Sequence, residues 1–161
     1  MRKIVSPWKR GSGFMCFGCG ADNQLGLQMQ MIEGDNGEII CKWHPKDYFQ
    51  GWHDVLHGGI QCTLMDEIAA WVVFHDLKAT GMTAKLDTKF IKSVYTTDSE
   101  LTIVGKLVKT AHQMAWIDTY IQNSKGEICA SASAVYKVFS TDVSTKQFGF
   151  SELTFEDMPQ E

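Results

Sequence analysis

Apolar and polar residues alternate along several stretches of the chain, which is the pattern of β-strands buried on one face. The first alternation covers residues 27–31 and the second covers residues 39–43, with the sequence Asp-Asn-Gly at 35–37 between them. Asn-Gly tolerates positive φ at both central positions of a tight turn. The pattern therefore predicts a β-hairpin, followed by a loop over residues 45–55.

The period of the pattern changes between residue 58 and about residue 78. Apolar residues recur there at helical spacing, and the opposite side of the same helix is apolar too. The only charged residues between Gly59 and Phe74 are Asp66 and Glu67. A helix that is apolar on all sides is buried on all sides, so this segment is predicted to be the central helix of the domain.

Four alternating segments after the helix predict four more strands, over residues 83–90, 101–108, 114–121 and 128–138. In the first of them, Ala84, Leu86, Thr88 and Phe90 alternate with Thr83, Lys85, Asp87 and Lys89. The element order predicts an α+β domain in which an antiparallel sheet wraps around one long buried helix. One such sheet cannot cover the whole helix, so we expect a second copy to pair edge to edge and complete the burial.

The two ends of the chain show no clear period. Glycines interrupt residues 1–26, which we expect to form an irregular leader. The polar residues 140–161 are assigned no element and form a tail, so the folded domain is expected to be residues 27–139.

Composition narrows the class of protein. A chain of 161 residues fits one domain, and its net charge of −4 argues against a nucleic-acid or anionic-membrane partner. No apolar run is long enough to cross a bilayer and no signal-peptide core follows the basic N-terminus, so a cytoplasmic location is expected. The five cysteines are an odd number and fit reduced core residues better than a disulfide framework.

The start of the predicted helix carries the strongest chemical signal. Gly58 and Gly59 follow His57 there, and glycines at a helix start let a ligand approach the backbone closely. The free N–H groups of the first turn favour a developing negative charge, as in an oxyanion hole. Asp66 is costly in so apolar a helix unless it is paired or faces a cavity. It could act as a nucleophile or a general base, whereas Glu67 is expected to mark a solvated stripe.

These residues also carry a family resemblance. The segment GWHDVLHGGIQCTLMDEIAAW at 51–71 resembles the centre of hot-dog-fold acyl-CoA thioesterases, in particular the phenylacetate-degradation-type group. The leader CFGCGADNQLGL at 16–27 and the strand LDTKFIKSV at 86–94 are similar to segments of the same group. The resemblance implies a dimer, often paired again into a tetramer. It also implies active sites at the dimer interface and a pantetheine tunnel between subunits.

The resemblance assigns roles by position. Gly59 matches the oxyanion donor, Asp66 the catalytic carboxylate, and His57 a residue that orients the site. Thr83 falls where some relatives have a hydroxyl that helps to place the water. Gln50 is the nearest candidate for an amide that contacts the thioester, although the intervening residues make its alignment ambiguous.

Two further sets of residues have alternative interpretations. Lys89 and Lys92 could meet the phosphates of coenzyme A or simply lie on a solvated face. Cys16 and Cys19 form a Cys-x-x-Cys pair, but a structural zinc site needs four ligands and the sequence has no second pair. Cys41 or His44 could complete such a site only through the fold.

The sequence thus favours an enzyme that hydrolyses an acyl-CoA thioester to a free acid and coenzyme A without a metal or redox cofactor. The alternative is a non-catalytic hot-dog domain that binds acyl-CoA. A protein with zinc or redox chemistry at Cys16 and Cys19 is a third hypothesis.

Overall fold

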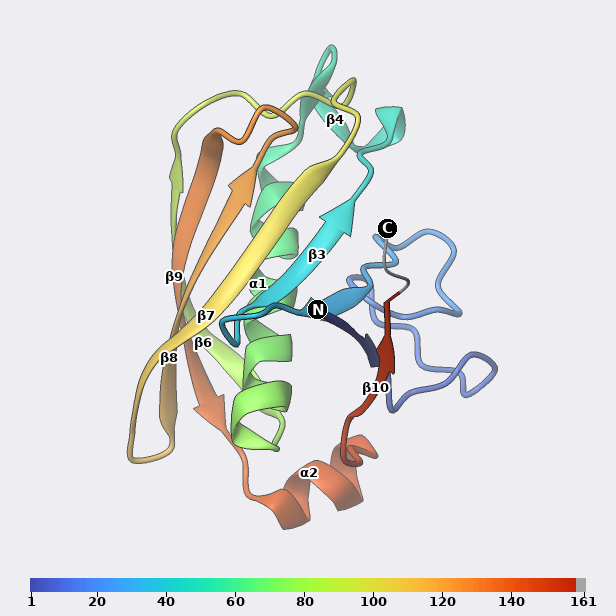
Figure 1. Cartoon of the computed structure of the whole chain (residues 1–161), viewed down its shortest axis with the longest axis vertical. Helices are drawn as coiled ribbons and strands as arrows, with labels where there is room; N and C mark the ends of the chain where they lie inside the picture. The colour runs from blue at the N-terminus through green and yellow to red at the C-terminus, as the bar shows by residue number, and fades with distance from the viewer. Residues whose placement is uncertain (159–161) are drawn as a thin grey trace.

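A computed structural model describes residues 1–158. An eight-stranded antiparallel sheet wraps around one long helix, α1, in the strand order β10-β1-β2-β3-β7-β8-β9-β6, and β4 pairs with β5 separately (Figure 1). The strands are β1 (Arg2–Val5), β2 (Met31–Glu33), β3 (Ile39–Trp43), β4 (Gln50–Trp52), β5 (Val55–Leu56), β6 (Gly81–Phe90), β7 (Leu101–Ala111), β8 (Met114–Gln122), β9 (Ile128–Val138) and β10 (Thr154–Asp157). The helices are the 3-10 helix η1 (Asp47–Phe49), α1 (Gly58–Leu77) and α2 (Thr141–Phe148).

The predicted architecture is confirmed for β3, α1 and the strands from β6 to β9. The helix begins at Gly58 and ends at Leu77, and each of the four alternating segments after it is a strand. Gly105 of β7 lies directly under the helix, where an added Cβ would come within 3.0 Å of Val72. Small residues on β9, among them Ala130 and Ala134, are fully buried on the same side. Small side chains therefore let the sheet approach the helix closely.

Both ends of the chain differ from the prediction. β1 belongs to the expected irregular leader, and α2 and β10 belong to the expected tail. β1 pairs with β10, about 150 residues further along the chain, as well as with β2. β1 has only four residues and its main partner is distant in sequence, so no hairpin pattern marks it. For this reason the sequence analysis did not predict it.

Residues 27–30 are also not a strand, and the loop over residues 45–55 is more ordered than expected. Gln28 has a φ of 51°, in the left-handed region, which interrupts the extended backbone before β2 begins at Met31. Between residues 45 and 55 the chain forms η1, β4 and the start of β5. Burial of alternate side chains at 27–31 thus occurs without a continuous strand.

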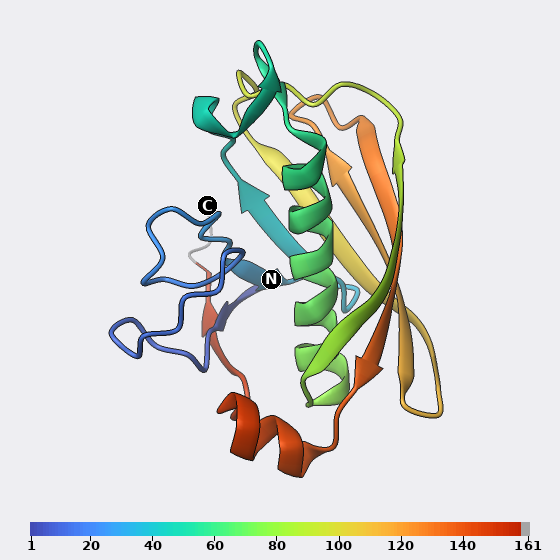
Figure 2. The ribbon, with the colours of Figure 1, turned by 180° about the vertical axis from the view of Figure 1, so that it is seen from behind.

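The leader and the C-terminal segment cover the side of α1 that faces away from the sheet (Figure 2). Trp8 stacks on Phe14 at a centroid distance of 4.6 Å, and both Trp8 and Phe150 pack against Phe74 of the helix. Part of the burial that we expected from a second copy is therefore supplied by the chain itself. No helix within residues 1–158 is long and apolar enough to cross a membrane.

Candidate active site

His57 caps the N-terminus of α1. Its Nδ1 accepts a hydrogen bond of 2.9 Å from the Gly59 N–H, so the ring is neutral at this nitrogen and carries its proton on Nε2. The Gly58 and Ile60 N–H groups donate to no other group within residues 1–158. The candidate oxyanion donor is thus engaged in a cap, and two neighbouring N–H groups of the first turn are free.

Two glycines hold the His57 ring between them. A Cβ added at Gly51 would lie 3.1 Å from His57 Cδ2, and one added at Gly59 would lie 3.1 Å from His57 Nδ1. Any side chain at Gly59 therefore presses on the cap before it reaches a ligand. The group that closely approaches the Gly59 backbone in this structure is thus the His57 ring.

A cavity of about 600 Å³ opens beside this helix end. His57, Gly58 and Gln61 of the helix terminus line it, together with Trp52 from β4 and the segment 90–93 after β6. Trp52 is 83% exposed and Phe90 is 56% exposed, so two large aromatic side chains border the cavity. This volume is in the range of small-molecule sites.

Gln61 is a candidate site residue that the sequence did not indicate. Its side chain is buried and lines the cavity, and its Nε2 donates to the Leu56 carbonyl at 3.0 Å. Its Oε1 is buried with no hydrogen-bond partner within the described chain. Such an atom needs an explanation, because an unsatisfied buried acceptor costs about 1–3 kcal/mol. A lone glutamine in an apolar helix was the only signal available.

Asp66 lies in a second cluster, further along α1. Its Oδ1 accepts hydrogen bonds of 2.8 Å from both Thr83 Oγ1 of β6 and Tyr136 OH of β9. Its Oδ2 has no protein partner within residues 1–158. One oxygen is thus anchored by two hydroxyls while the other is available to a water or a substrate.

A β-bulge brings Thr83 to this cluster. Thr83 pairs with Tyr136 and Lys85 pairs with Val135, so Ala84 is an extra residue on β6. Without the bulge, the alternation would turn Thr83 to the same face as Lys85, away from the helix. The site therefore depends on a register shift that the sequence pattern does not reveal.

Tyr136 is suited to be a permanent donor. Burial, reinforced by the negative charge of Asp66, raises the pKa of the phenol. The hydroxyl thus stays protonated at physiological pH and donates to Asp66.

The remaining predicted residues are dispersed. Gln50 is exposed and its Oε1 accepts from the Asp54 N–H at 2.9 Å, within the β4–β5 hairpin. Lys92 lines the cavity at the helix start and pairs with Glu127 at 2.6 Å. Lys89 instead lines a separate hollow with Asp118, on β6 and β8. The structure therefore places Lys92 in the cavity lining, whereas Gln50 lies next to the helix start only through its pairing with Leu56, and Lys89 lies elsewhere.

Glu67 does not mark a solvated stripe, contrary to our expectation. It lies under the leader, where its Oε1 accepts from Trp71 Nε1 at 3.0 Å and its Oε2 lies 3.4 Å from Cys16 Sγ. Burial raises the pKa of Glu67 to about 7. Hydrogen bonds from the Cys19 thiol and from nearby backbone N–H groups lower the pKa of Cys16 to about 5.

Gly59 and Asp66 share one face of α1 but are well separated. Seven residues are close to two helical turns, so the two positions lie about 10 Å apart along the axis. Asp66 is also absent from the residues that line the cavity beside His57. One carbonyl group cannot contact the Gly59 N–H and the Asp66 carboxylate of the same chain.

Comparison with known proteins finds a family model that matches the central part of the chain. Residues 53–130 match the sequence model of the thioesterase superfamily. An uncharacterized protein of Schizosaccharomyces pombe is 26% identical over 110 residues, which are 65% of this chain and 62% of that protein. The chain thus spans less than two thirds of the length of this relative.

Solved structures of thioesterases share the architecture. A thioesterase superfamily protein superposes with a TM-score of 0.69 at 22% identity, over 83% of this chain and 68% of that one. A hypothetical thioesterase of Streptococcus pneumoniae with coenzyme A has a TM-score of 0.64 at 23% identity, over 70% and 86%. A Streptococcus mutans protein bound to acetyl CoA has a TM-score of 0.64 at 22% identity, over 70% and 89%. The sheet wrapped around α1 is therefore the hot-dog fold of these thioesterases.

Proposed function

We propose that this chain is a thioesterase that hydrolyses an acyl-CoA thioester to a free acid and coenzyme A. The observation that carries the proposal is the Asp66 carboxylate, which Thr83 and Tyr136 anchor through one oxygen while the other has no partner among the described residues. A binding module has no need of an acid held in this way. The match to the thioesterase superfamily and the coenzyme A ligands of two structural neighbours support the same class of substrate.

Two chains would together form each active site. Gly59 and Asp66 of one chain lie about 10 Å apart, too far to act on the same carbonyl group. They can act on one thioester only if a second copy of the chain contributes one of the two residues. β6 is the edge strand beside this face of α1, and ten residues of unpaired edge call for a cover. A dimer that pairs β6 with β6 places two helices side by side, so that Gly59 of one copy approaches the partner's acid.

The N-terminus of α1 would polarise the thioester carbonyl. The Gly59 N–H transfers its hydrogen bond from His57 Nδ1 to the substrate oxygen, and the free N–H groups of Gly58 and Ile60 add to the positive potential. The Gly59 N–H therefore makes one hydrogen bond both before and after the substrate binds. His57 then orients the site rather than attacking.

Asp66 would supply the second half of the reaction, as a nucleophile or as a general base. As a base, Oδ2 takes a proton from a water that attacks the carbonyl carbon, and the carbon–sulfur bond breaks. The proton then passes to the coenzyme A thiolate, which leaves as the thiol. Lys92 lies at the mouth of the cavity, where it could meet a phosphate of coenzyme A after leaving Glu127.

The test is a screen of acyl-CoA thioesters with detection of the released thiol. Asp66→Asn should lower kcat by roughly 10²–10⁴, the range for loss of a positioned acid–base group. The control Asp87→Asn alters an exposed acid on β6 and should change kcat little. Comparable small effects of both variants would contradict the catalytic assignment.

The alternative function is binding of acyl-CoA without hydrolysis. The apolar rim formed by Trp52 and Phe90 fits an acyl or pantetheine chain whether or not chemistry follows. Saturable binding of several acyl-CoA esters with no thiol release above the uncatalysed rate would establish this alternative.

A further inference from the structure

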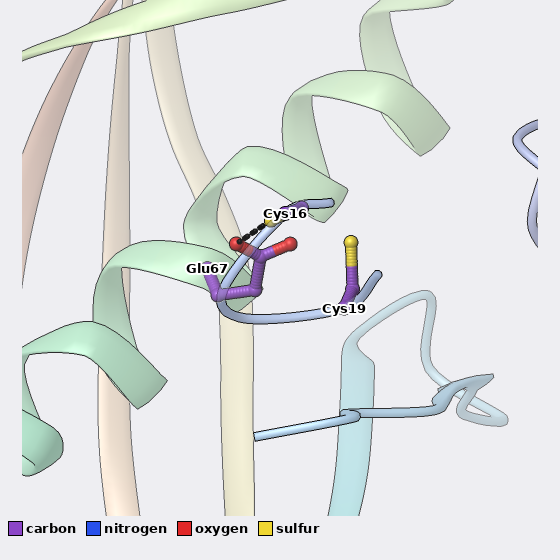
Figure 3. A group of neighbouring side chains, drawn as sticks. All are labelled: Cys16, Cys19 and Glu67. Carbon is purple, nitrogen blue, oxygen red and sulfur yellow. Dashed lines mark hydrogen bonds between the residues drawn. The ribbon is translucent and has the colours of Figure 1, made fainter. Parts of the chain in front are cut away.

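The leader brings two thiols to a buried carboxylate on α1. The Cys16 and Cys19 Sγ atoms and an oxygen of Glu67 all lie within 4.8 Å of one another, and the three side chains point toward a common centre (Figure 3). The sequence suggested Cys41 or His44 as partners of the cysteines. The fold supplies Glu67 instead, since His44 bonds to the Ser99 carbonyl and Cys41 is outside this group.

The loop from Cys16 to Gly20 is built around the Glu67 carboxylate. The Gly20 N–H donates to the Cys16 carbonyl at 2.9 Å and closes a tight turn. A Cβ at Gly20 would lie 2.6 Å from that carbonyl oxygen, and a Cβ at Gly18 would overlap the Glu67 carboxylate itself. Glycine at both positions therefore lets the two thiols close over the acid.

Glu67 has no cationic partner among the described residues. It takes part in no ion pair within residues 1–158, and the hydrogen bonds that it accepts there come from Trp71 Nε1 and the Cys16 thiol. A carboxyl group and two thiols gathered away from water are neutralised either by their own protons or by a metal ion. The cluster therefore offers three ligand atoms to a positive ion without the loss of an existing ion pair.

The geometry suits a small thiophilic ion. Zinc binds thiolate sulfur at about 2.3 Å and carboxylate oxygen at about 2.0–2.2 Å, so neighbouring ligands of a tetrahedral site lie roughly 3.5–3.8 Å apart. The Cys16 Sγ to Glu67 Oε2 distance of 3.4 Å is already close to this range. Rotation of the thiols would bring the remaining pairs from within 4.8 Å to this spacing.

A path for the ion and a fourth ligand are available. Cys19 lines a cavity of about 330 Å³ between the leader and β1 and β2, which Lys9 and Arg10 border. A water in this cavity can occupy the fourth position. Three protein ligands and one solvent ligand are the arrangement of open zinc sites, unlike closed structural sites with four protein ligands, so the ion would stay in contact with solvent.

We propose that Cys16, Cys19 and Glu67 bind one zinc ion that clamps the leader to α1. Binding releases the two thiol protons, and that of Glu67 where it is protonated, to the solvent. The ion ties residue 67 to the leader and so fixes the helical turn that carries Asp66. The proposal does not depend on thioesterase activity.

The test is a titration of the reduced, chelator-treated full chain with Co²⁺. One equivalent should produce a thiolate-to-cobalt charge-transfer band and the visible bands of a tetrahedral ion, and Zn²⁺ should displace them. Cys16→Ser and Glu67→Gln should weaken zinc binding by more than about 100-fold, because loss of a residue that only hydrogen-bonds to a metal ligand already costs about 10–100-fold. Cys62→Ser and Cys129→Ser remove thiols outside the cluster and should leave binding unchanged.

A second readout reports the clamp directly. Zinc should raise the melting temperature and slow proteolysis of the leader in the wild-type chain, and it should do neither in Glu67→Gln, which preserves the size of the side chain. A wild-type chain that gives no cobalt spectrum overturns the proposal. A cobalt spectrum that survives Cys16→Ser overturns it as well, because the ion would then lie elsewhere.

Discussion

At the scale of single residues, the hydroxyls around Asp66 are the decisive contacts. Thr83 and Tyr136 both donate to Oδ1 at 2.8 Å and hold the carboxylate in one orientation. Thr83→Val and Tyr136→Phe each remove one donor, so each should lower kcat roughly tenfold with KM nearly unchanged, as expected when a catalytic group loses its alignment. Steady-state kinetics with the best acyl-CoA of the screen measures both constants.

Thr83→Ser is the matched control, because it keeps the hydroxyl and loses only a methyl group. It should retain most of the wild-type kcat. If Thr83→Ser and Thr83→Val have equal activity, the hydrogen bond to Asp66 does not contribute to turnover.

The His57 cap decides how Gly59 must be tested. A side chain at Gly59 displaces the ring that accepts its N–H, so Gly59→Ala and His57→Ala should both destabilise the fold by about 1 kcal/mol through loss of the cap. Only Gly59→Ala also crowds the substrate oxygen. If the Gly59 N–H is an oxyanion donor, the kcat of Gly59→Ala should be about 10²–10³-fold lower than the kcat of His57→Ala, although the two variants are equally stable.

Urea unfolding and thioester kinetics on the same preparations separate the two effects. His57→Ser provides another capping group at this position and should restore the stability. Gly59→Ala and His57→Ala with equal kcat would remove Gly59 from the mechanism.

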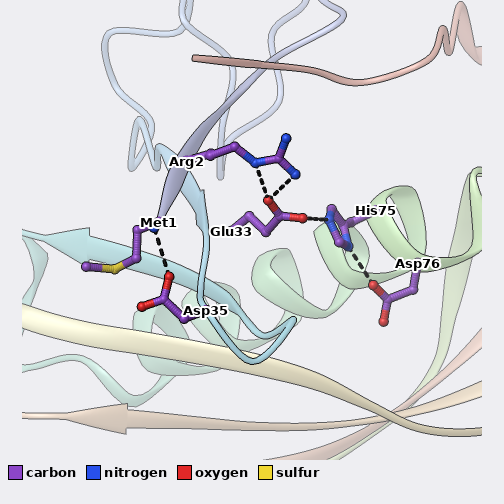
Figure 4. A network of polar contacts seen from close by, with 6 residues as sticks. All are labelled: Met1, Arg2, Glu33, Asp35, His75 and Asp76. Carbon is purple, nitrogen blue, oxygen red and sulfur yellow. Dashed lines mark hydrogen bonds and ion pairs between the residues drawn. The ribbon is translucent and has the colours of Figure 1, made fainter. Parts of the chain in front are cut away.

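At the scale of elements, a charged network ties the end of α1 to β1 and β2 (Figure 4). Glu33 of β2 accepts from Arg2 at 2.6 Å and from His75 Nε2 at 2.9 Å, while His75 Nδ1 lies 2.6 Å from Asp76. The hydrogen bond to Asp76, followed by that to Glu33, raises the pKa of His75. Burial raises the pKa of Glu33, but the hydrogen bonds from His75 and Arg2 outweigh it and leave the value lowered.

These shifts set a pH window for the stability of the helix end. The contribution of His75 is complete below its unfolded pKa of 6.5 and is lost as pH rises through the higher folded value. That of Glu33 is complete above 4.5 and is lost as pH falls through its lower folded value. His75→Gln should therefore lower the free energy of unfolding by about 2 kcal/mol near pH 6, the worth of a hydrogen bond to a charged group, and by less at alkaline pH.

Urea unfolding at pH 6 and at pH 8.5 measures the difference. His53→Gln is the control, since His53 is 92% exposed and should change stability little at either pH. A penalty for His75→Gln that is the same at both pH values would show that packing, rather than the charged network, is responsible.

At the scale of the whole molecule, the shared active site makes a prediction about mixtures. Asp66→Asn and Gly59→Val should each be inactive, but a mixed dimer contains one site with an intact glycine and an intact aspartate. Random exchange of subunits should then restore about a quarter of the wild-type activity, since half of the dimers are mixed and each has one working site. Mixing after partial unfolding and refolding, followed by a thiol-release assay, measures this recovery.

Sedimentation of the wild-type chain is the companion measurement. A dimer or a tetramer would agree with the proposal that a second copy covers the β6 edge. A folded monomer that hydrolyses acyl-CoA, or a mixture that recovers no activity, would show that one chain supplies the complete site.

The order of elements and the chemical candidates follow from the sequence alone. Alternation and helical periodicity are local properties of the chain, and they located α1, β3 and the strands from β6 to β9. The glycines after His57 and the acid at Asp66 are conspicuous because each departs from its local pattern. Apolar burial and backbone conformation act within a few residues, so a pattern of a few residues is enough to predict them.

Contacts between distant segments were decided only by the tertiary structure. The bulge at Ala84 turned Thr83 toward Asp66, and the packing around the helix start left Gln61 Oε1 buried without a hydrogen-bond partner among residues 1–158. Glu67 became a buried neighbour of Cys16, 51 positions away, because the leader folded back over the helix. Each depends on a register or a packing arrangement that the whole chain selects, since burial and hydrogen bonding are satisfied collectively and not by neighbours in sequence.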